Sequence, residues 1–387
     1  MDRFDVAIVG AGPAGSRAAW RLARKGVRVA LVDGSHPREK PCGGGVTGRA
    51  LDLVADALAT GAVPSVEVES ATFAYGGRTA RVGLSSHDRP PLRVVGRRDF
   101  DGALFEGAIA AGAVPVRARA TSIERDGRAW SIATRDGTIA AAWLLGADGA
   151  TSLVRRRVLA PFERHDLSIA AGYFVHGLSQ ADIVIGFEDA PPGYLWSFPR
   201  PDHLAIGICA QANESSSAAL LRSVGGWIDR NVDAPHSVRE RYAWPIPSLS
   251  ADTLALPMAG TGWMLLGDAA GFVDPITREG IFFALTSADR AADALLDGSG
   301  DPGRLYDGRV RAEISSELIR AARLKARFFV PRFMGMLVMA LQRSDSIRAI
   351  MADLVAGHQT YRGLRRRLIG TLEFRLMAQL FGLQRLD

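Results

Sequence analysis

The sequence predicts a mixed α/β (α+β) fold: a Rossmann-like nucleotide-binding domain with an inserted antiparallel-sheet domain, followed by a C-terminal helical region. Three observations support this prediction. Residues 4–33 run from an apolar stretch through a glycine-rich turn into a helical pattern and a second apolar stretch. Residues 165–255 hold short β-prone segments separated by Pro, Gly and Asp, and residues 304–387 show helical patterns throughout.

The N-terminal segment reads as strand, tight turn, helix and second strand. Gly10, Gly12 and Gly15 stand at G-x-G-x-x-G spacing, which permits a sharp turn, close approach of a pyrophosphate and close packing of the helix on its strand. The N-terminus of this helix offers free N–H groups to phosphates, and Asp33 can accept both ribose hydroxyls. The segment therefore predicts dinucleotide binding, and we expect Gly10→Ala to abolish cofactor retention by crowding the pyrophosphate.

The composition is that of an ordinary soluble globular protein, with 387 residues, 48% of them hydrophobic and 23% charged. Two cysteines give no disulfide framework, which suits a reducing cytosol. The chain enters a strand at once, which leaves no room for a signal peptide, and it has no uninterrupted apolar run long enough to span a membrane. We therefore expect a cytoplasmic protein.

The loop at residues 36–51 contains the run PCGGG, Pro41 to Gly45. Three successive glycines cannot form a stable helix or strand interior, so the backbone here can come close to a flat or bulky group. A flexible loop is the alternative interpretation. Cys42 could equally be a small packed thiol.

Two further junctions fall where a dinucleotide would be contacted. After alternating residues 66–95, a helix begins near Asp99, and Arg97 or Arg98 at its start could meet a phosphate or the cofactor ring, or simply be solvated. Residues 115–147 give a β-meander pattern that stops at Asp148-Gly149, before another helix. A strand end with an acid beside the first glycine loop is a place for a second contact.

A short strand in the inserted sheet carries Tyr194, Trp196 and Phe198 at alternate positions, so all three face one side. Such a stripe is more often part of a core. Residues 262–295 nevertheless favour the interpretation of the stripe as a wall of the substrate site. In this segment a buried strand ends at Gly267-Asp268 and a long helix begins near Gly280. The first N–H groups of that helix would stabilise negative charge, and Asp268 suits a cofactor hydroxyl.

These boundaries divide the chain into three parts. We expect residues 1–75, 96–160 and 258–303 to form a discontinuous nucleotide-binding domain, residues 76–95 and 161–257 the antiparallel-sheet substrate domain, and residues 304–387 the helical region.

The motifs together resemble the flavoprotein hydroxylase superfamily and, within it, the geranylgeranyl reductases, over about residues 1–300. The glycine loop, Asp148-Gly149 and Gly267-Asp268 look like the three FAD motifs of the superfamily, while PCGGG and YLWSFP look like signatures of the reductases. The resemblance implies FAD stretched from the glycine loop to the turn at residues 275–280, with a geranylgeranyl or polyprenyl chain, or a related polyene, beside the aromatic strand. It also implies C=C reduction by hydride from reduced flavin N5, with a proton from water, Cys42 or Tyr194.

The residues that follow from the motifs and the resemblance fall into three groups. Expected cofactor contacts are Gly10, Gly12, Ala14, Gly15, Asp33, Gly34, Cys42, Gly43, Gly44, Arg97, Asp148, Gly149, Asp268, Gly280 and Ile281. Expected substrate contacts are Gly45, Tyr194, Trp196, Phe198 and Pro275, and expected catalytic residues are Cys42, Tyr194 and Trp196.

Three other functions fit parts of the pattern. An FAD-dependent monooxygenase of an aromatic or lipid-like natural product shares the FAD motifs, but such enzymes usually have His where Gly271 stands. A flavin-dependent halogenase resembles YLWSFP but needs a lysine on the substrate side of the flavin, and the chain has none between Lys40 and Lys325. A non-catalytic FAD-bearing scaffold would not need complete motifs.

The helical tail concentrates the positive charge. The chain carries a net charge of +6, but residues 301–387 hold 16 Lys+Arg against 8 Asp+Glu, so the rest is slightly negative. Arg365 to Arg367 beside apolar residues suit the cytoplasmic leaflet of a membrane, or the tail could cap the substrate cavity. We expect no nucleic-acid binding and, from the spacing of the histidines, no metal. The electron donor would be NAD(P)H or a ferredoxin, because no second nucleotide fingerprint is present.

Overall fold

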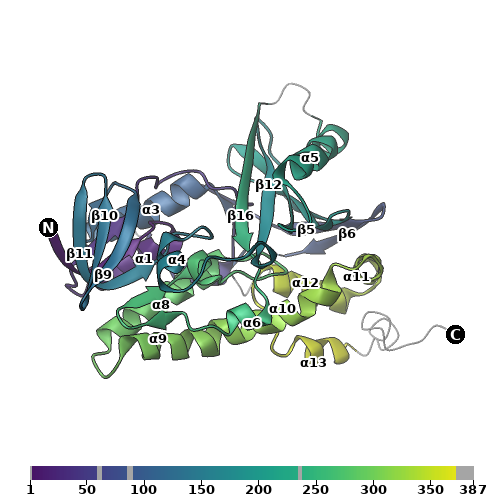
Figure 1. The fold of residues 1–387 in the computed structure, drawn as a ribbon. Helices are drawn as coiled ribbons and strands as arrows, with labels where there is room; N and C mark the ends of the chain where they lie inside the picture. The colour runs from purple at the N-terminus through teal and green to yellow at the C-terminus, as the bar shows by residue number, and fades with distance from the viewer. Residues whose placement is uncertain (1, 59–62, 85–89, 234–237, 372–387) are drawn as a thin grey trace.

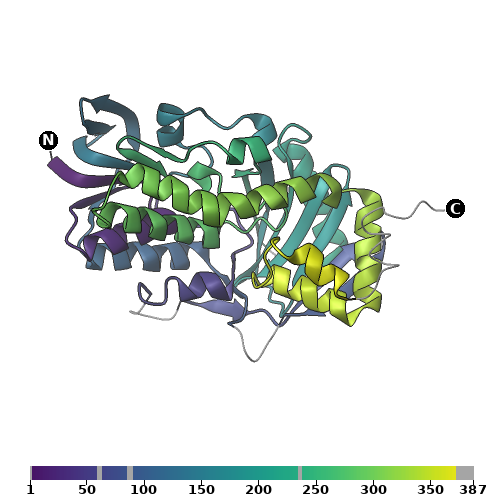
Figure 2. The ribbon, with the colours of Figure 1, turned by 90° about the horizontal axis from the view of Figure 1, so that it is seen from below.

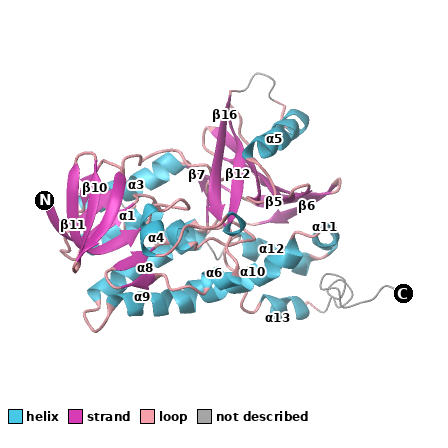
Figure 3. Ribbon diagram, in the orientation of Figure 1, coloured by secondary structure: helices cyan, strands magenta, loops and turns pink. Residues whose placement is uncertain are grey.

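The computed structural model describes residues 2–58, 63–84, 90–233 and 238–371. Two separate large sheets dominate it, with helices packed below and between them (Figure 3). A third, three-stranded sheet is formed by β3 (Gly45–Val46), β7 (Arg93–Val95) and β4 (Ser65–Glu67). The mixed α/β architecture predicted from the sequence is confirmed.

The eight-stranded sheet belongs to the nucleotide-binding part. Its central strand β1 (Asp2–Val9) runs parallel to β2 (Val29–Val32) on one side and to β11 (Gly137–Gly146) on the other. Residues 6–9 are buried because this strand has sheet on both sides and helices over it. The remaining strands are β8 (Val114–Val116), β9 (Ala120–Asp126), β10 (Ala129–Thr134), β17 (Ala259–Gly260) and β18 (Trp263–Leu265).

Helices α1 (Pro13–Ala23), α3 (Arg97–Ala110) and α8 (Ile281–Leu296) pack together beside this sheet. Small residues of α1 and α8, among them Ala18 and Ala288, are fully buried, so the two helices approach closely. Short helices complete this part: α2 (Gly48–Asp52), α4 (Leu153–Val158), the 3₁₀ turn Arg164–Asp166, α6 (Ala251–Leu254) and α7 (Gly267–Ala270).

The seven-stranded sheet has the order β16-β12-β15-β14-β13-β5-β6. Its strands are β16 (Arg239–Pro247), β12 (Leu167–His176), β15 (His203–Gln211), β14 (Pro192–Pro199), β13 (Ile183–Asp189), β5 (Ser70–Tyr75) and β6 (Arg78–Gly83).

Two features of this sheet differ from the sequence prediction. Strand β5 pairs in parallel with β13, so residues 70–75 belong to this sheet and not to the nucleotide-binding part, where the predicted boundary put them. Short strands alone do not reveal their partners, because pairing is a tertiary property. Helix α5 (Ser217–Asn231) was not predicted. Its Leu220, Val224 and Ile228 cover one face of the sheet, which leaves the other face for the site.

The described part of the tail is helical, as predicted. It comprises α9 (Pro302–Val310), a π-helical turn (Arg311–Ser315), α10 (Ser316–Phe328), α11 (Pro331–Arg343), α12 (Asp345–Val355) and α13 (Leu364–Ile369). From below, the segment α9 to α10 runs the length of the molecule, and α11 to α13 lie under the second sheet (Figure 2). None of the helices in the described residues is long and apolar enough to cross a membrane.

Candidate functional site

Three adjoining cavities run from the glycine loop to the C-terminal helices. The nucleotide cavity, of about 1030 Å³, is lined by the glycine loop and the end of β2. It shares Lys40, Arg97 and Asp268 with the middle cavity, of about 230 Å³, which lies against the aromatic strand. The middle cavity in turn shares four apolar residues with the distal cavity, of about 540 Å³: Ile276, Phe328, Met351 and Leu354.

The three glycines of the first loop have different surroundings. A Cβ on Gly10 would lie 2.3 Å from the carbonyl oxygen of Ala147, and one on Gly15 would lie 1.8 Å from the oxygen of Gly10. A Cβ on Gly12 would meet only His36 Nε2, at 3.8 Å. Gly10 and Gly15 therefore allow backbone packing, whereas Gly12 faces open space in front of the N-terminus of α1, where a pyrophosphate fits.

Asp33 is already surrounded by donors from its own loop. One carboxylate oxygen accepts from Ala11 N (2.9 Å) and lies 2.8 Å from His36 Nδ1, while the other accepts from the amides of Ser35 and His36. Burial by itself would raise the pKa of Asp33, but the hydrogen bonds and charge of His36 outweigh it and hold that pKa well below the usual value. Asp33 thus orders the loop; contact with a ribose stays a prediction.

His36 was missed by sequence reasoning. It lies between Asp33 and Asp101, with Nε2 3.6 Å from the Asp101 carboxylate, and these acids raise its pKa although burial opposes them. Its buried Nε2 has no hydrogen-bond partner and faces the space beside Gly12. A donor with positive character at this point fits a dinucleotide phosphate. The signal in sequence was an unremarkable histidine three residues after the acid.

The second and third expected FAD contacts also border the nucleotide cavity, which is lined by Ala14, Gly34, Asp148, Gly149 and Asp268. Asp148 accepts hydrogen bonds from Leu153 N (2.6 Å) and Val154 N (3.2 Å), so it holds the start of α4. Burial raises its pKa. Asp268 lies 3.3 Å from Lys40 Nζ at the boundary with the middle cavity, where a cofactor hydroxyl could bind both.

The PCGGG loop lines the middle cavity, and it also packs against other parts of the protein. A Cβ on Gly43 would lie 2.8 Å from the ring of Phe198, and one on Gly44 would lie 2.6 Å from Arg200 Nε. The close approach that the glycines permit is therefore, in this structure, to the aromatic strand and to Arg200. Whether Gly43 and Gly44 also contact the cofactor stays a prediction, and so does substrate contact by Gly45.

Arg200 is a second residue that the sequence did not reveal. It is fully buried and donates to Cys42 O (2.8 Å), Gly43 O (3.1 Å) and Glu39 Oε1 (2.7 Å). Glu39 also accepts from the amides at the start of α3. Arg200 thereby fixes the PCGGG loop to the second sheet and to α3. Its position two residues after Phe198 in YLWSFPRP is the only signal that sequence offers.

Arg97 is committed to a buried ion pair. Its Nε and Nη2 donate to the two oxygens of Asp101 at 2.9 and 2.7 Å, and its guanidinium faces Cys42. Burial alone would lower the pKa of Arg97, but Asp101 and Cys42 raise it. Arg97 lines both the nucleotide and the middle cavity, but most of its donors are in use, so a role towards a phosphate stays a prediction. Cys42 Sγ accepts from Gly44 N at 3.3 Å.

The aromatic strand is β14, and all three of its predicted residues line the middle cavity. Tyr194 OH lies 3.4 Å from Thr277 O, and burial raises its pKa well above the ordinary value, so the hydroxyl keeps its proton. The rings of Tyr194 and Trp196 lie 5.7 Å apart. Trp196 Nε1 is buried without a partner. Substrate contact and catalysis by these residues stay predictions.

The turn before α8 faces the middle cavity with residues 276–281, including the expected Gly280 and Ile281. Pro275, predicted to contact substrate, is buried and does not line this cavity. The reason is that Asp274 accepts from the amides of Ile276 (2.7 Å) and Thr277 (3.0 Å), which turns the chain so that the next residues form the wall.

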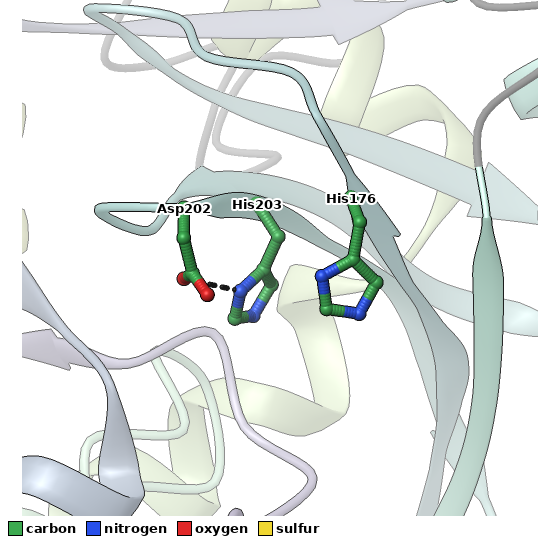
Figure 4. A group of neighbouring side chains, drawn as sticks. All are labelled: His176, Asp202 and His203. Carbon is green, nitrogen blue, oxygen red and sulfur yellow. Dashed lines mark hydrogen bonds and ion pairs between the residues drawn. The ribbon is translucent and has the colours of Figure 1, made fainter.

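One group of possible metal ligands comes together although the sequence spacing gave no sign of it. His176 on β12 and His203 on β15 are cross-strand neighbours, and Asp202 lies 2.7 Å from His203 Nδ1 (Figure 4). One ligand atom from each lies within 4.8 Å of the others. Burial lowers the pKa of His203, the hydrogen bond to Asp202 opposes this, and the charge of Arg200 adds to the lowering. The charge of Arg200 also opposes cation binding. We assign no metal to this group.

Comparisons with known proteins agree with this geometry. Residues 3–221 match the FAD binding domain family. The chain is 32% identical to a geranylgeranyl diphosphate reductase from Rhodobacter capsulatus over 311 residues, which cover 76% of this chain and 75% of the relative. It is 31% identical to a digeranylgeranylglycerophospholipid reductase from Methanothrix thermoacetophila, over 85% of this chain and 88% of the relative.

A similar fold occurs in a solved structure described as geranylgeranyl bacteriochlorophyll reductase-like, from Thermoplasma acidophilum. It has a TM-score of 0.78 and 22% sequence identity and covers 96% of this chain and 99% of that chain. The open space at Gly12, the His36 Nε2 without a hydrogen bond, and the two adjoining cavities fit FAD. The chain therefore belongs to the geranylgeranyl reductase family of FAD-dependent oxidoreductases.

Proposed function

We propose that this enzyme saturates C=C bonds in the chain of an isoprenoid or related polyene. The observation that carries the proposal is that the middle and distal cavities adjoin, with Ile276, Phe328, Met351 and Leu354 in the walls of both. The shared wall is apolar, and the middle cavity begins where the flavin end of the cofactor would lie. A long apolar chain suits these two cavities better than a compact aromatic ring does.

The residues of the chain have separate tasks in this proposal. Bound FAD, once reduced, supplies the hydride from N5. The glycine loop and His36 would hold its phosphates, and Asp268 with Lys40 would bind a hydroxyl group between the phosphates and the flavin. The first amides of α8 stabilise negative charge at the flavin end. Phe198 and Trp196 shape the wall against which the alkene lies, and the apolar lining excludes water.

The proton that completes the reduction comes from water, Cys42 or Tyr194. Tyr194 keeps its hydroxyl proton because burial disfavours the phenolate, and it lies in the wall of the middle cavity. Cys42 lines the same cavity, beside Arg97. The variants Tyr194→Phe and Cys42→Ala distinguish these candidates. The variant that lacks the proton donor should form the saturated product more slowly, while reoxidation of the reduced flavin can still be followed.

The tail is proposed to take the substrate from a membrane surface. Arg320, Arg323 and Arg365 line the distal cavity together with Leu364 and Leu368 of α13. Basic and apolar side chains at one opening suit an anionic leaflet. Sedimentation with vesicles of neutral lipid, and of the same lipid with added phosphatidylglycerol, tests this. Binding that requires the anionic lipid and disappears in high salt is the expected result, and equal recovery in the supernatant contradicts it.

The test of the reaction is anaerobic. The purified flavoprotein is reduced with dithionite and mixed with geranylgeranyl diphosphate or a polyprenyl quinone, and flavin absorbance and lipid mass are followed. Reoxidation with a product heavier by two hydrogens per turnover is expected. If lipid leaves the flavin reduced but oxygen with a small aromatic gives a hydroxylated product, the monooxygenase alternative is correct. Replacing dithionite by NADPH, NADH or reduced ferredoxin then identifies the electron donor.

A further inference from the structure

Arg278 stands out in the wall of the middle cavity because its backbone adopts a conformation that favours glycine. Its φ is 62°, and it is the only non-glycine residue with positive φ in the described part of the chain. Such a conformation is costly for a residue with a Cβ. A strained residue that persists at a cavity is a reason to look for a function of its side chain.

Arg278 is half-buried, and two of its three guanidinium nitrogens have no hydrogen bond. These are Nε and Nη1, which are buried, and no ion pair to Arg278 occurs among the residues that the structure describes. A buried guanidinium normally makes several such bonds, since desolvation of its charge is otherwise uncompensated. Most other residues lining the same cavity are apolar, and the acids among them, Asp268 and Glu279, form ion pairs with Lys40 and Arg49.

The neighbouring acids are engaged elsewhere. Asp274 accepts from two backbone amides and from Tyr361 OH at 3.1 Å, and burial raises its pKa. Glu279 accepts from Thr47 Oγ1 at 2.7 Å and forms an ion pair with Arg49. Neither carboxylate forms a hydrogen bond or ion pair with the Arg278 side chain among the residues that the structure describes.

A second cation, Lys325, lies near Arg278. In the part of the chain that the structure describes, its Nζ donates to two neutral oxygens, Gln211 Oε1 at 2.8 Å and Ser248 Oγ at 2.7 Å. Burial and then the charge of Arg278 lower the pKa of Lys325 to about 8, so the two groups lie within electrostatic reach of each other. The charge of Arg278 also acts to lower the pKa of Tyr194 on β14, although burial outweighs it, so Arg278 lies near the seven-stranded sheet. It does not line the nucleotide cavity.

We propose that Arg278 binds an anionic group of the substrate inside the middle cavity. The proposal rests on the proposed function and narrows its substrate class to amphiphiles that carry a carboxylate or phosphate near the flavin, with the apolar chain extending into the distal cavity. Guanidinium binds either anion through two parallel hydrogen bonds, which explains why a strained arginine occupies a position suited to glycine.

The test uses one chain with three head groups: geranylgeraniol, geranylgeranoic acid and geranylgeranyl diphosphate. Dissociation constants are measured on the oxidised FAD-loaded enzyme from changes in flavin absorbance, so that no turnover is needed. The wild-type enzyme should bind at least one of the two anions tenfold or more tightly than the alcohol. Preference for the acid indicates a carboxylate substrate, and preference for the diphosphate indicates a phosphorylated one.

Three variants locate the effect. Arg278→Gly should remove the preference for the anion while changing the alcohol less than twofold, and it should raise the melting temperature of the apoprotein, because glycine relieves the strained φ. Arg278→Lys should keep part of the preference, since it keeps the charge. Arg222→Gln, which removes an exposed charge on α5 outside all three cavities, should leave the preference intact.

Equal binding of the three heads by the wild-type enzyme would overturn the proposal. So would an equal loss for all three in Arg278→Gly, or a shift of the flavin spectrum in that variant without any change in anion preference, which would assign Arg278 to the cofactor. The reaction is judged separately: if anions bind through Arg278 but no lipid reoxidises the reduced flavin, C=C reduction fails and the anion site stands. If all three lipids bind and are reduced equally well, C=C reduction stands and the anion site fails.

Discussion

Gly10 and Gly12 lie two residues apart, yet the structure predicts opposite effects for their replacement by alanine. Gly12 has φ −71° and ψ −172°, which alanine adopts without strain, and its Cβ would meet only His36 Nε2 at 3.8 Å. A Gly→Ala change at a compatible position stabilises the fold by about 0.4–1 kcal/mol through the unfolded chain. The apoprotein of Gly12→Ala should therefore be as stable as the wild type or slightly more so.

The cofactor should nevertheless bind poorly to Gly12→Ala, because the methyl group fills the space in front of α1. Losing one or two charge-assisted hydrogen bonds to the pyrophosphate costs about 1.5–3 kcal/mol each, or roughly 10- to 150-fold in affinity per bond. Apoprotein prepared by removing FAD is titrated with FAD by fluorescence quenching, and its melting temperature is measured by circular dichroism. Wild-type FAD affinity in Gly12→Ala would refute the placement of the pyrophosphate.

Gly10→Ala is the comparison. Its φ is +102° and its Cβ would overlap the Ala147 carbonyl oxygen at 2.3 Å, so strain of about 1–2 kcal/mol and overpacking of about 1–3 kcal/mol should destabilise the apoprotein itself. The loss of flavin expected for this variant thus arises from displaced backbone and not from crowding of the pyrophosphate, as the sequence alone suggested. An apoprotein of Gly10→Ala that melts like the wild type would contradict this reason.

Three further predictions follow from the site. Arg200→Met leaves Glu39 and the carbonyls of Cys42 and Gly43 without their buried partner, and it should cost about 3–5 kcal/mol, which lowers the melting temperature on the order of 5–10 °C. Arg241→Met, at an exposed arginine on β16, should change the melting temperature little. Equal melting temperatures of the two variants would show that the bonds from Arg200 to the PCGGG loop are unimportant for stability. Ile350→Trp should fill part of the distal cavity and reduce turnover of a C20 chain while sparing a C10 chain, and Ala349→Trp on the exposed side of α12 should spare both; loss of both chain lengths in Ile350→Trp would place the chain elsewhere. The pKa of Lys325 is about 8 in the folded protein and 10.5 in the unfolded chain. Between these pH values the unfolded chain binds the extra proton, so the free energy of unfolding rises with pH by on the order of 1–3 kcal/mol. Denaturant unfolding at pH 7.5 and pH 10 should show this rise in the wild type and not in Lys325→Met, and an equal change in both proteins would refute it.

The sequence predicted the parts of the site whose chemistry lies in short segments. The glycine loop, Asp148, Asp268 and the residues before α8 border the nucleotide cavity or the middle cavity. Each lies at a strand end followed by a turn, and the carboxyl ends of parallel strands meet at one edge of the sheet. The stripe at Tyr194, Trp196 and Phe198 likewise follows from the two-residue period of a strand. Family membership followed from the same local motifs.

Tertiary structure alone decided what those segments contact. Arg200 reaches the PCGGG loop across 157 and 158 positions of sequence, and β5 joins the seven-stranded sheet by pairing with β13. The sequence around Arg278 indicates only a turn. Its positive φ and the two buried nitrogens without a hydrogen bond are properties of the tertiary structure. Local spacing encodes which face a side chain takes, whereas the partner on that face depends on how distant strands and helices pack, and this packing is settled only by burial of the whole chain.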